Sequence, residues 1–570
     1  MAHYQRDDYV RFLDTERVKQ EDSYYDLVSK KATLLKSRGE VFVGKFQKMN
    51  AAGIALFIVR RTDNMPRKNS FWTACYFIDG KWDYRNWENL SWLDLRSDFQ
   101  RRYSDATCVF LSKVEDPRFC LVGISGLTCE FASILQEDFP IIAFGPKDPP
   151  LKYLLNLRDL CEDTSSPMVN KVLDMEMSAD SWAPTFLDST VDFPLVVEDR
   201  ITSGNALAVQ GPPGTGKTHR IALYVRKLLD EGHSVLVTAL TNRALMEVAE
   251  KDSLESYLSS HRISKTSLTI DEQKELPELQ RVIDNNCNAA QGYLTLATFY
   301  VSSGWALEAE VPPFDYVIMD EASQALLPMI AATYKLGSRV MWIGDQSQLP
   351  PIVKTVEEDI VRNGWRSMIE GFDTVCKYMN PCSFMLCDSY RLPARAVKST
   401  GVFYHNYLRS VSKINEVPSS LPFVNKEGGP VLIDITMQEG KKAPTNAFET
   451  IYSMVRQLFS EKSDYKIAVL SKFRETTRKL YEFFVMNWEA NELPTNLKIE
   501  TVDRVQGTTE DFCFFLIPNA SFIYSIDRPL FNVATSRAQY NTFIVVTKDC
   551  LKRHMPEEVR NYFNSFLCEQ

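Results

Sequence analysis

The sequence contains no apolar run long enough to cross a membrane, since none approaches the roughly 20 residues of a helical span. Residues 1–8 also lack the apolar region of a secretory signal. We therefore expect no membrane association, and a protein that stays inside the cell, in the cytoplasm or the nucleus.

Closely spaced cysteine pairs are missing as well. The twelve cysteines are scattered and form no Cys-x-x-Cys pair, which is typical of a reduced compartment. The tightest group comprises Cys376, Cys382 and Cys387. A metal cluster is one interpretation of this group, and buried or free thiols are the favoured one.

Positive charge is not in excess, because 65 Lys and Arg residues face 74 Asp and Glu residues, for a net charge of −9. This balance argues against a protein held to nucleic acid by its overall charge, although a local basic channel remains possible. With 570 residues and 45% hydrophobic composition, the chain is globular and long enough for several domains.

Residues 211–218 read Gly-Pro-Pro-Gly-Thr-Gly-Lys-Thr, which fits the phosphate-binding loop of P-loop NTPases. Glycines let the backbone turn tightly and bring its N–H groups up to phosphate oxygens. The apolar residues before the loop and the helical spacing after it predict a strand, the loop and a helix in that order. The phosphates would then lie at a helix N-terminus.

Each residue of this loop is a candidate nucleotide contact: Gly211, Pro212, Pro213, Gly214, Thr215, Gly216, Lys217 and Thr218. Lys217 would reach the β- and γ-phosphates of ATP as a point charge. The Thr218 hydroxyl would bind Mg²⁺.

A second apolar strand ends in Asp320 and Glu321, about a hundred residues after the loop. Asp320 would hold Mg²⁺ through water, and Glu321 would orient and deprotonate the attacking water. Both motifs can meet at one crevice, because ligands of open parallel sheets gather at the strand carboxyl ends. A further strand, 340–343, leads to Gln348, which is placed to sense the γ-phosphate.

The N-terminal third has a different sequence pattern. Residues 1–39 are polar with helical spacing and predict one or two surface helices. Short strand-like runs then follow at 41–43, 54–59, 74–78, 108–111 and 120–122, with a turn at 79–80. They predict a small antiparallel barrel or sandwich, which could grip a nucleic acid strand or act as a spacer.

Tryptophans alternate with basic residues in this region: Trp72, Lys81, Trp82, Arg85, Trp87, Trp92 and Arg96. Aromatic side chains among basic ones can stack on nucleic acid bases. Packing in the core or at an edge is the favoured interpretation for each tryptophan.

The remaining apolar runs alternate with helical stretches, which predicts parallel α/β sheets. We expect strands at 235–239 and 294–298, separated by a charged, helical insertion at 250–290. A second sheet would contain the strands 384–386, 431–435, 467–470, 499–502, 512–517 and 543–546.

Taken in order, the motifs resemble those of the superfamily 1 helicases, and most closely the branch of the nonsense-mediated-decay helicase and senataxin. The resemblance covers about residues 195–550. It rests on the words at 211–218, 320–324 (Asp-Glu-Ala-Ser-Gln), 344–351 (Gly-Asp-Gln-Ser-Gln-Leu-Pro-Pro), 389–393 (Ser-Tyr-Arg-Leu-Pro), 501–507 (Thr-Val-Asp-Arg-Val-Gln-Gly) and 532–538 (Asn-Val-Ala-Thr-Ser-Arg-Ala).

The resemblance implies two RecA-like domains with ATP in the cleft between them. The expected division is a helical segment at 1–39, a β-rich accessory domain at 40–190, and RecA-like domains at 191–370 and 371–570. Arg391 and Arg537 would reach the γ-phosphate from the second domain, where a guanidinium neutralises charge on the transferring phosphoryl group. Tyr390 and Gly507 would also contact the nucleotide.

The resemblance further implies contacts to nucleic acid phosphate and sugar, with little sequence preference. The matching positions are Thr238, Asn242, Thr298 and Thr501, with Arg243 added. For each threonine, capping of the next helix is the alternative. The implied activity is ATP-dependent movement along single-stranded DNA or RNA, 5′ to 3′, with duplex unwinding. The alternative is a P-loop ATPase that remodels a protein partner bound by residues 1–190.

The chain departs from the family pattern at several positions. The glutamine that usually reads adenine is missing from residues 196–200, which leaves the choice of nucleotide base open. The family's Gln-Gly-x-Glu reads Gln-Gly-Thr-Thr at 506–509. We expect no nuclease motif in residues 1–190 and none after the last helicase motif.

Overall fold

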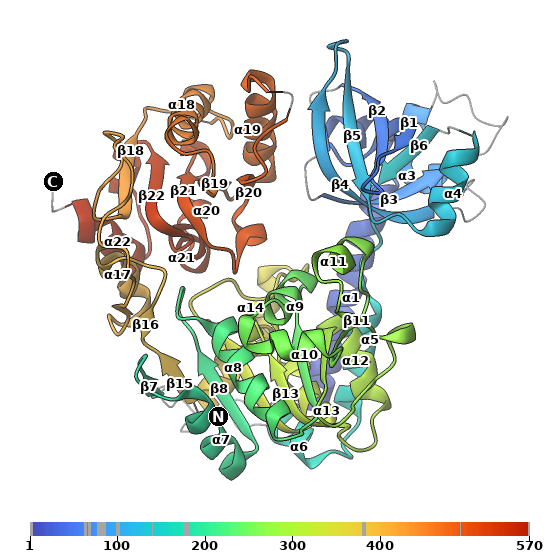
Figure 1. The fold of residues 1–570 in the computed structure, drawn as a ribbon, viewed down its shortest axis with the longest axis vertical. Coiled ribbons are helices and arrows are strands. Elements are labelled where there is room, and N and C mark those ends of the chain that lie inside the picture. The colour runs from blue at the N-terminus through green and yellow to red at the C-terminus, as the bar shows by residue number, and fades with distance from the viewer. Residues whose placement is uncertain are drawn as a thin grey trace.

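The computed structural model describes residues 4–61, 65–66, 70–76, 87–97, 103–138, 141–174, 183–378, 383–438, 440–490 and 492–567. These residues form three large β-structures and one two-stranded sheet, and Figure 1 shows three bodies, each built on one of the large β-structures. A closed barrel near the N-terminus is drawn in blue, and sheets of nine and five parallel strands form the green and orange-red RecA-like domains, which are called the first and second motor domains below after the role that the resemblance implies. The predicted fold class, two RecA-like domains with a β-rich accessory region, is confirmed.

The accessory region is a six-stranded antiparallel barrel in the order β1-β2-β5-β4-β3-β6. Its strands are β1 (Phe42–Met49), β2 (Ala55–Arg60), β3 (Ser70–Tyr76), β4 (Tyr103–Lys113), β5 (Phe119–Ser125) and β6 (Ile141–Gly145). Short helices accompany it: α2 (Ala32–Ser37), α3 (Trp92–Ser97) and α4 (Cys129–Asp138). Strand β6, which closes the barrel onto β1 and β3, was not predicted, because its short run lies between two prolines.

The tryptophans of the barrel are core residues wherever the structure describes them. Trp72, Trp87 and Trp92 are buried, and Trp72 packs edge-on against Phe42. Arg96 binds Asp148 through two parallel hydrogen bonds of 2.5 Å. The predicted base-stacking positions Lys81, Trp82 and Arg85, the turn at 79–80 and the end of the strand at 74–78 lie outside the described residues. Core packing is thus the correct interpretation of the three described tryptophans.

The first motor domain is built on the strand order β11-β10-β12-β9-β13-β14-β8-β15-β7. The strands are β7 (Thr185–Leu187), β8 (Ala206–Gln210), β9 (Val235–Ala239), β10 (Ile263–Lys265), β11 (Gln280–Arg281), β12 (Leu294–Thr298), β13 (Phe314–Met319), β14 (Gly337–Gly344) and β15 (Ser383–Leu386). Its helices include α7 (Phe193–Gly204), α8 (Lys217–Asp230), α9 (Asn242–Ala249), α10 (Glu255–Ser259), α11 (Ile270–Glu275), α12 (Phe299–Glu308), α13 (Leu327–Leu336), α14 (Glu357–Asn363), α15 (Arg366–Ile369) and α16 (Gly371–Tyr378). The central strands are buried on both faces, as their unbroken apolar sequences require.

Two predictions about this sheet are wrong. The insertion at 250–290 is not purely helical, because its strands β10 and β11 extend one edge of the sheet. The strand 384–386 does not belong to the second sheet, since β15 pairs in parallel with β8 and with β7. An apolar run shows that a strand is buried, but it does not show which sheet the strand joins.

The second motor domain contains a five-stranded parallel sheet in the order β18-β22-β21-β19-β20. Its strands, all predicted, are β18 (Gly429–Asp434), β19 (Ile467–Ser471), β20 (Leu497–Thr501), β21 (Glu510–Leu516) and β22 (Ala538–Val546). The helices include α17 (Ala394–Thr400), α18 (Thr445–Glu461), α19 (Arg474–Asn487), α20 (Phe522–Ser525), α21 (Arg528–Thr535) and α22 (Glu557–Leu567). The two-residue strands β16 (Asp388–Ser389) and β17 (Arg409–Ser410) pair where the chain enters this domain.

The N-terminal helix α1 (Arg6–Val28) belongs to the core of the first motor domain. Its residues Tyr9, Phe12 and Leu13 are buried in one cluster with residues of α5 (Lys152–Glu162) and α6 (Pro167–Leu173). The expected helices at 1–39 are therefore present as α1 and α2, and the apolar face of α1 packs on the first motor domain. The sequence shows an apolar stripe on this helix, but nothing in it identifies the surface that the stripe covers.

Glu16 fixes α1 to the first motor domain. This carboxylate is buried, and it accepts hydrogen bonds from the Lys354 and Thr355 amides and from the Thr355 hydroxyl, at 2.8 to 2.9 Å. The loop that it holds follows Gln348, one of the predicted catalytic residues, by a few positions. Glu16 therefore connects the N-terminal helix to a loop of the nucleotide site.

Replacing Glu16 with Ala is expected to destabilise the fold by about 3 kcal/mol, because three donors, two of them buried, lose a charged acceptor. The first unfolding transition in a thermal or urea melt would report the change. As a control, Glu21→Ala removes an exposed carboxylate of the same helix, which pairs with Arg17, and should cost less than about 1 kcal/mol. Equal melting of the two variants would contradict an anchoring role for Glu16.

The barrel also contacts the second motor domain. Lys113 of β4 donates a hydrogen bond of 2.8 Å to the carbonyl of Trp488, and Arg478 of α19 donates one of 2.9 Å to the carbonyl of Arg38. Tyr481 of α19 packs against the barrel core. The barrel thus bridges the N-terminal helices and the second motor domain.

The structure also bears on the predictions about metals and membranes. Cys376 and Cys387 are buried free thiols, whereas Cys382 lies outside the described residues. In the part of the chain that the structure describes, no group of three or more His, Cys, Asp and Glu residues is arranged to hold a metal ion. Within the same residues, every helix is too short or too polar to cross a lipid bilayer.

Candidate functional site

The phosphate-binding loop joins β8 to α8, as predicted, and its backbone needs glycine. Gly214 and Gly216 have φ angles of +74° and +76°, which L-residues rarely adopt. A Cβ on Gly214 would also lie 2.5 Å from Cβ of Arg391. The Lys217 Nζ atom donates to the Gly211 carbonyl at 2.9 Å, so its ammonium group folds back over the loop.

The acidic pair follows β13, the strand that lies two places from β8 in the sheet. Asp320 is buried, and its Oδ1 accepts a hydrogen bond of 2.8 Å from the Glu321 amide. Burial raises the pKa of Asp320 to about 7, with a further contribution from the Glu321 carboxylate, while Lys217 opposes the shift. Asp320 therefore lies close enough to Lys217 for their charges to interact.

These side chains fit a magnesium ion. Asp320 and Thr218 offer oxygen ligands, which Mg²⁺ prefers, and the raised pKa of Asp320 indicates a carboxylate that a cation would stabilise. Thr218 is the second residue of α8 and is half-buried beside the loop. Bound there, Mg²⁺ would neutralise phosphate charge in the nucleotide.

Gln348 is held in place by a buried polar network. Its Nε2 donates to Oδ2 of Asp345 at 2.5 Å, and the same carboxylate accepts from Gln210 at 2.8 Å and from the Tyr404 hydroxyl at 2.7 Å. Asn532 of the second motor domain donates to Tyr404 at 2.7 Å. Gln348 thus lies at a junction between the two motor domains.

The contacts of Asp345, Tyr404 and Asn532 were not predicted from the sequence. Asp345 and Asn532 lie within the motifs at 344–351 and 532–538, but a sequence motif does not identify the hydrogen-bond partner of either side chain. Tyr404 lies outside those motifs. These residues could have been recognised only as a cluster of buried polar side chains, and that cluster forms where the two domains meet.

The two predicted arginines lie together at the edge of the second motor domain. Arg391 donates to the Ser536 carbonyl at 3.1 Å and to the Gly507 carbonyl at 3.5 Å. Arg537 is buried and donates to the Val533 carbonyl at 2.9 Å. Burial and the positive charge of Arg537 lower the pKa of Arg391 to about 9, and burial also lowers the pKa of Arg537. Two desolvated guanidinium groups of this kind are stabilised by an anion.

Contacts across the domains bring the predicted catalytic groups to one place. Gln506 Nε2 donates to the Glu321 carboxylate at 3.3 Å, and the Tyr390 amide donates to the Gly214 carbonyl at 2.8 Å. The Tyr390 ring is half-exposed near Gly216. Gly507, with a φ angle of +87°, brings its backbone close to the Glu321 side chain.

The predicted nucleic acid contacts differ in their accessibility. Thr238, Thr298 and Thr501 are buried, and Thr238 pairs with the Ser302 hydroxyl at 3.2 Å. Asn242 and Arg243 open helix α9 and reach the surface. The structure thus brings two of the five predicted residues to an exposed helix N-terminus.

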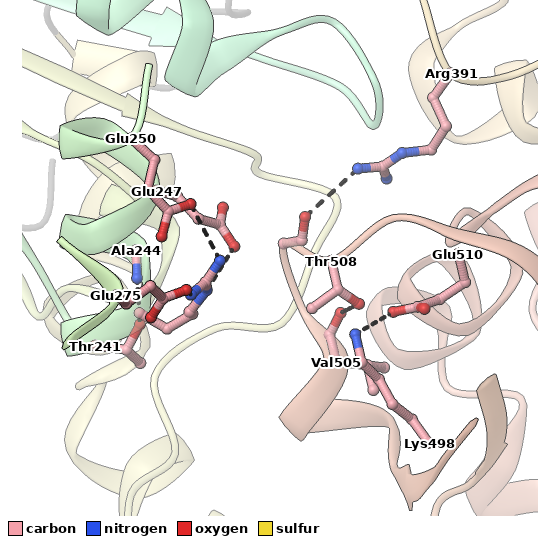
Figure 2. A network of polar contacts seen from close by, with 12 residues as sticks. Thr241, Ala244, Glu247, Glu250, Glu275, Arg391, Lys498, Val505, Thr508 and Glu510 are labelled. Atoms are coloured by element: carbon pink, nitrogen blue, oxygen red, sulfur yellow. Dashed lines mark hydrogen bonds and ion pairs between the residues drawn. The ribbon is translucent and has the colours of Figure 1, made fainter. Parts of the chain in front are cut away.

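Arg243 pairs with three acidic side chains at the surface. Its guanidinium lies 3.0 Å from Glu275, 3.3 Å from Glu250 and 3.5 Å from Glu247. Burial raises the pKa of Glu250, and Glu275 and Glu247 add to the shift. Figure 2 shows these glutamates on the first motor domain and Arg391 beside the second. The charge of Arg243 is thus already balanced within the protein.

Comparison with known proteins agrees with this arrangement. Residues 195–356 match one family model described as an AAA domain, and residues 367–549 match a second with the same description. The DNA replication ATP-dependent helicase/nuclease DNA2 of Saccharomyces cerevisiae is 25% identical over 454 residues, which cover 69% of this chain and 28% of the yeast protein. The chain thus contains two regions that belong to families of AAA domains.

Other relatives of this chain carry similar names. The DNA replication ATP-dependent helicase/nuclease JHS1 of Arabidopsis thaliana is 24% identical over 398 residues, 62% of this chain and 28% of the plant protein. The chain thus spans less than a third of the length of either relative. A crystal structure of Arterivirus nonstructural protein 10, also a helicase, covers 85% of this chain and 78% of the viral one, with 13% identity and a TM-score of 0.36.

Proposed function

We propose that this protein is a helicase that hydrolyses ATP between its two motor domains, moves along single-stranded nucleic acid from 5′ to 3′, and unwinds duplexes. The observation that supports the proposal is that the predicted hydrolytic groups of both domains lie at one place. Lys217 and Glu321 come from the first domain, whereas Arg391 and Gln506 come from the second, and Gln506 contacts Glu321 directly.

Each group has a distinct part in the proposed reaction. The amides of the loop and the Lys217 ammonium bind the phosphates, and Glu321 accepts a proton from the attacking water. Arg391 and Arg537 stabilise the charge that develops on the transferring phosphoryl group. Asp320 and Thr218 are the residues that would hold Mg²⁺.

Hydrolysis depends on closure of the two motor domains onto each other, because the arginines belong to the second domain and the phosphate loop belongs to the first. The exposed N-terminus of α9 then offers Asn242 to the backbone of a strand. Alternating closure and opening would change the distance between strand contacts on the two domains, which is the basis of stepping.

We expect single strands to stimulate ATP hydrolysis at low salt, where phosphate contacts are strongest. Steady-state turnover would be measured without nucleic acid, with single-stranded DNA and with single-stranded RNA, and polarity with duplexes carrying one 5′ or 3′ tail. The named relatives act in DNA replication, which supports DNA as the first strand to test.

Full turnover without any response to either strand would overturn the proposal. It would favour an ATPase that remodels a protein partner, with the barrel as the docking module. The contacts of the barrel with α19 would then transmit closure of the second motor domain to that partner.

A further inference from the structure

A lysine is buried directly behind Asn242, one of the predicted nucleic acid contacts. The side chain of Lys265, at the end of β10, has no exposed surface. Its Nζ lies 2.9 Å from Oδ1 of Asn242, 3.1 Å from Oε2 of Glu272 and 3.2 Å from the carbonyl oxygen of Thr266. Three acceptors therefore satisfy the three N–H donors of the ammonium group, and Glu272 balances its charge.

This arrangement fixes the orientation of the Asn242 amide. The two ends of an amide have similar shapes, and in many settings either end can face a neighbour. An ammonium group, however, only donates, so the oxygen must face Lys265 and the NH₂ group must face away. In the part of the chain that the structure describes, no acceptor binds Asn242 Nδ2.

The neighbouring groups at the N-terminus of α9 are already engaged. The hydroxyl of Thr241 caps the helix by accepting from the Ala244 amide at 3.2 Å, and Arg243 is bound by three glutamates. The Nδ2 donors of Asn242 are thus oriented by Lys265 and lack an acceptor in the described part of the protein. Hydrogen bonds from such neutral donors to a phosphate oxygen are a common element of strand binding.

We propose that Lys265 is a positioning residue for strand binding, which holds the Asn242 amide with its N–H donors turned toward a phosphate of the nucleic acid. The proposal rests on the proposed function, since it concerns the strand that the motor follows. The insertion at 250–290 would then contribute to nucleic acid binding, because both Lys265 and Glu272 belong to it.

The test measures binding of a fluorescent oligo(dT) strand by anisotropy in Asn242→Ala, Lys265→Met and the double variant. Each single change is expected to weaken binding about 10-fold, the effect of one charge-assisted hydrogen bond. The double variant should bind no more weakly than the worse single one, because Lys265 acts through Asn242. Lys426→Met, which removes a surface lysine paired with Glu416, is the matched control and should bind as the wild type does.

The salt dependence separates positioning from general damage to α9. A neutral amide releases no counterion, so all of these variants should keep the wild-type slope of log Kd against log salt concentration. A slope reduced by about one in Lys265→Met would mean that a cationic contact was lost instead, and would overturn the proposal.

Asn242→Asp keeps the test decisive if Lys265→Met fails to fold. Its carboxylate still accepts from Lys265, so the fold should hold, but it presents oxygen to the strand and should weaken binding about 100-fold. Wild-type binding by Asn242→Asp or Lys265→Met, or multiplied effects in the double variant, would overturn the inference alone. Absence of strand binding by the wild type would overturn the proposed function as well.

Discussion

Replacing Lys217 with Ala is expected to reduce strand-stimulated ATP hydrolysis about 1000-fold, to the limit of detection. In the structure the Lys217 ammonium lies 2.9 Å from the Gly211 carbonyl, within the turn of the phosphate loop. Alanine would keep the backbone amides of the loop but remove the point charge that compensates the β- and γ-phosphates. Steady-state turnover at saturating strand concentration, with a melting curve for each protein, would test this.

Lys227→Ala is the matched control for that experiment. Lys227 lies on the same helix, α8, and forms a surface pair with Glu231 at 2.6 Å. Its loss should leave turnover within about 2-fold of the wild type, because exposed pairs contribute little. Wild-type turnover in Lys217→Ala would remove the phosphate loop from the reaction.

The sequence predicted most of the nucleotide site because each part is a local pattern. The loop at 211–218 follows a buried strand and begins a helix, and both neighbours are visible in the order of residues. Asp320 and Glu321 also stand at the end of an apolar run, and parallel strands present their ends at one edge of a sheet. The β-rich region was predictable for a similar reason, since turn residues separate its short strands.

Features that depend on the partner of an element were not predictable. The run 384–386 has the composition of any buried strand, yet β15 pairs with β8 of the first sheet. The stripe on α1 shows that one face is covered, but not that α5 covers it. Thr238 matched a family position for strand contact, whereas its hydroxyl is buried against Ser302.

The second large effect on ATP hydrolysis is expected at Glu321, which forms an acidic pair with Asp320. Glu321→Gln is expected to lower the rate of hydrolysis about 100- to 1000-fold, the usual range for loss of a general base. The glutamine oxygen can still accept the hydrogen bond that Gln506 donates to Glu321 at 3.3 Å, so the contact between the domains should survive. Binding of a fluorescent ATP analogue and steady-state turnover would be measured on the same protein.

Nucleotide binding should persist in this variant or become tighter. The Glu321 carboxylate contributes to the raised pKa of Asp320, so removing its charge should lower that pKa from about 7 toward the ordinary value. Asp320 would then be ionised over a wider range of pH, and the affinity for Mg²⁺-ATP below pH 7 should rise. Glu358→Gln, an exposed residue in the first turn of α14, is the matched control.

The two measurements separate the possible roles of Glu321. Slow hydrolysis with intact binding identifies a group that acts on the attacking water, because only the chemical step has changed. Loss of both binding and hydrolysis would instead identify a group that holds the nucleotide or its metal ion. Unchanged hydrolysis would exclude Glu321 as the base and would leave Gln348, fixed by Asp345 at 2.5 Å, as the nearest remaining candidate for orienting the water.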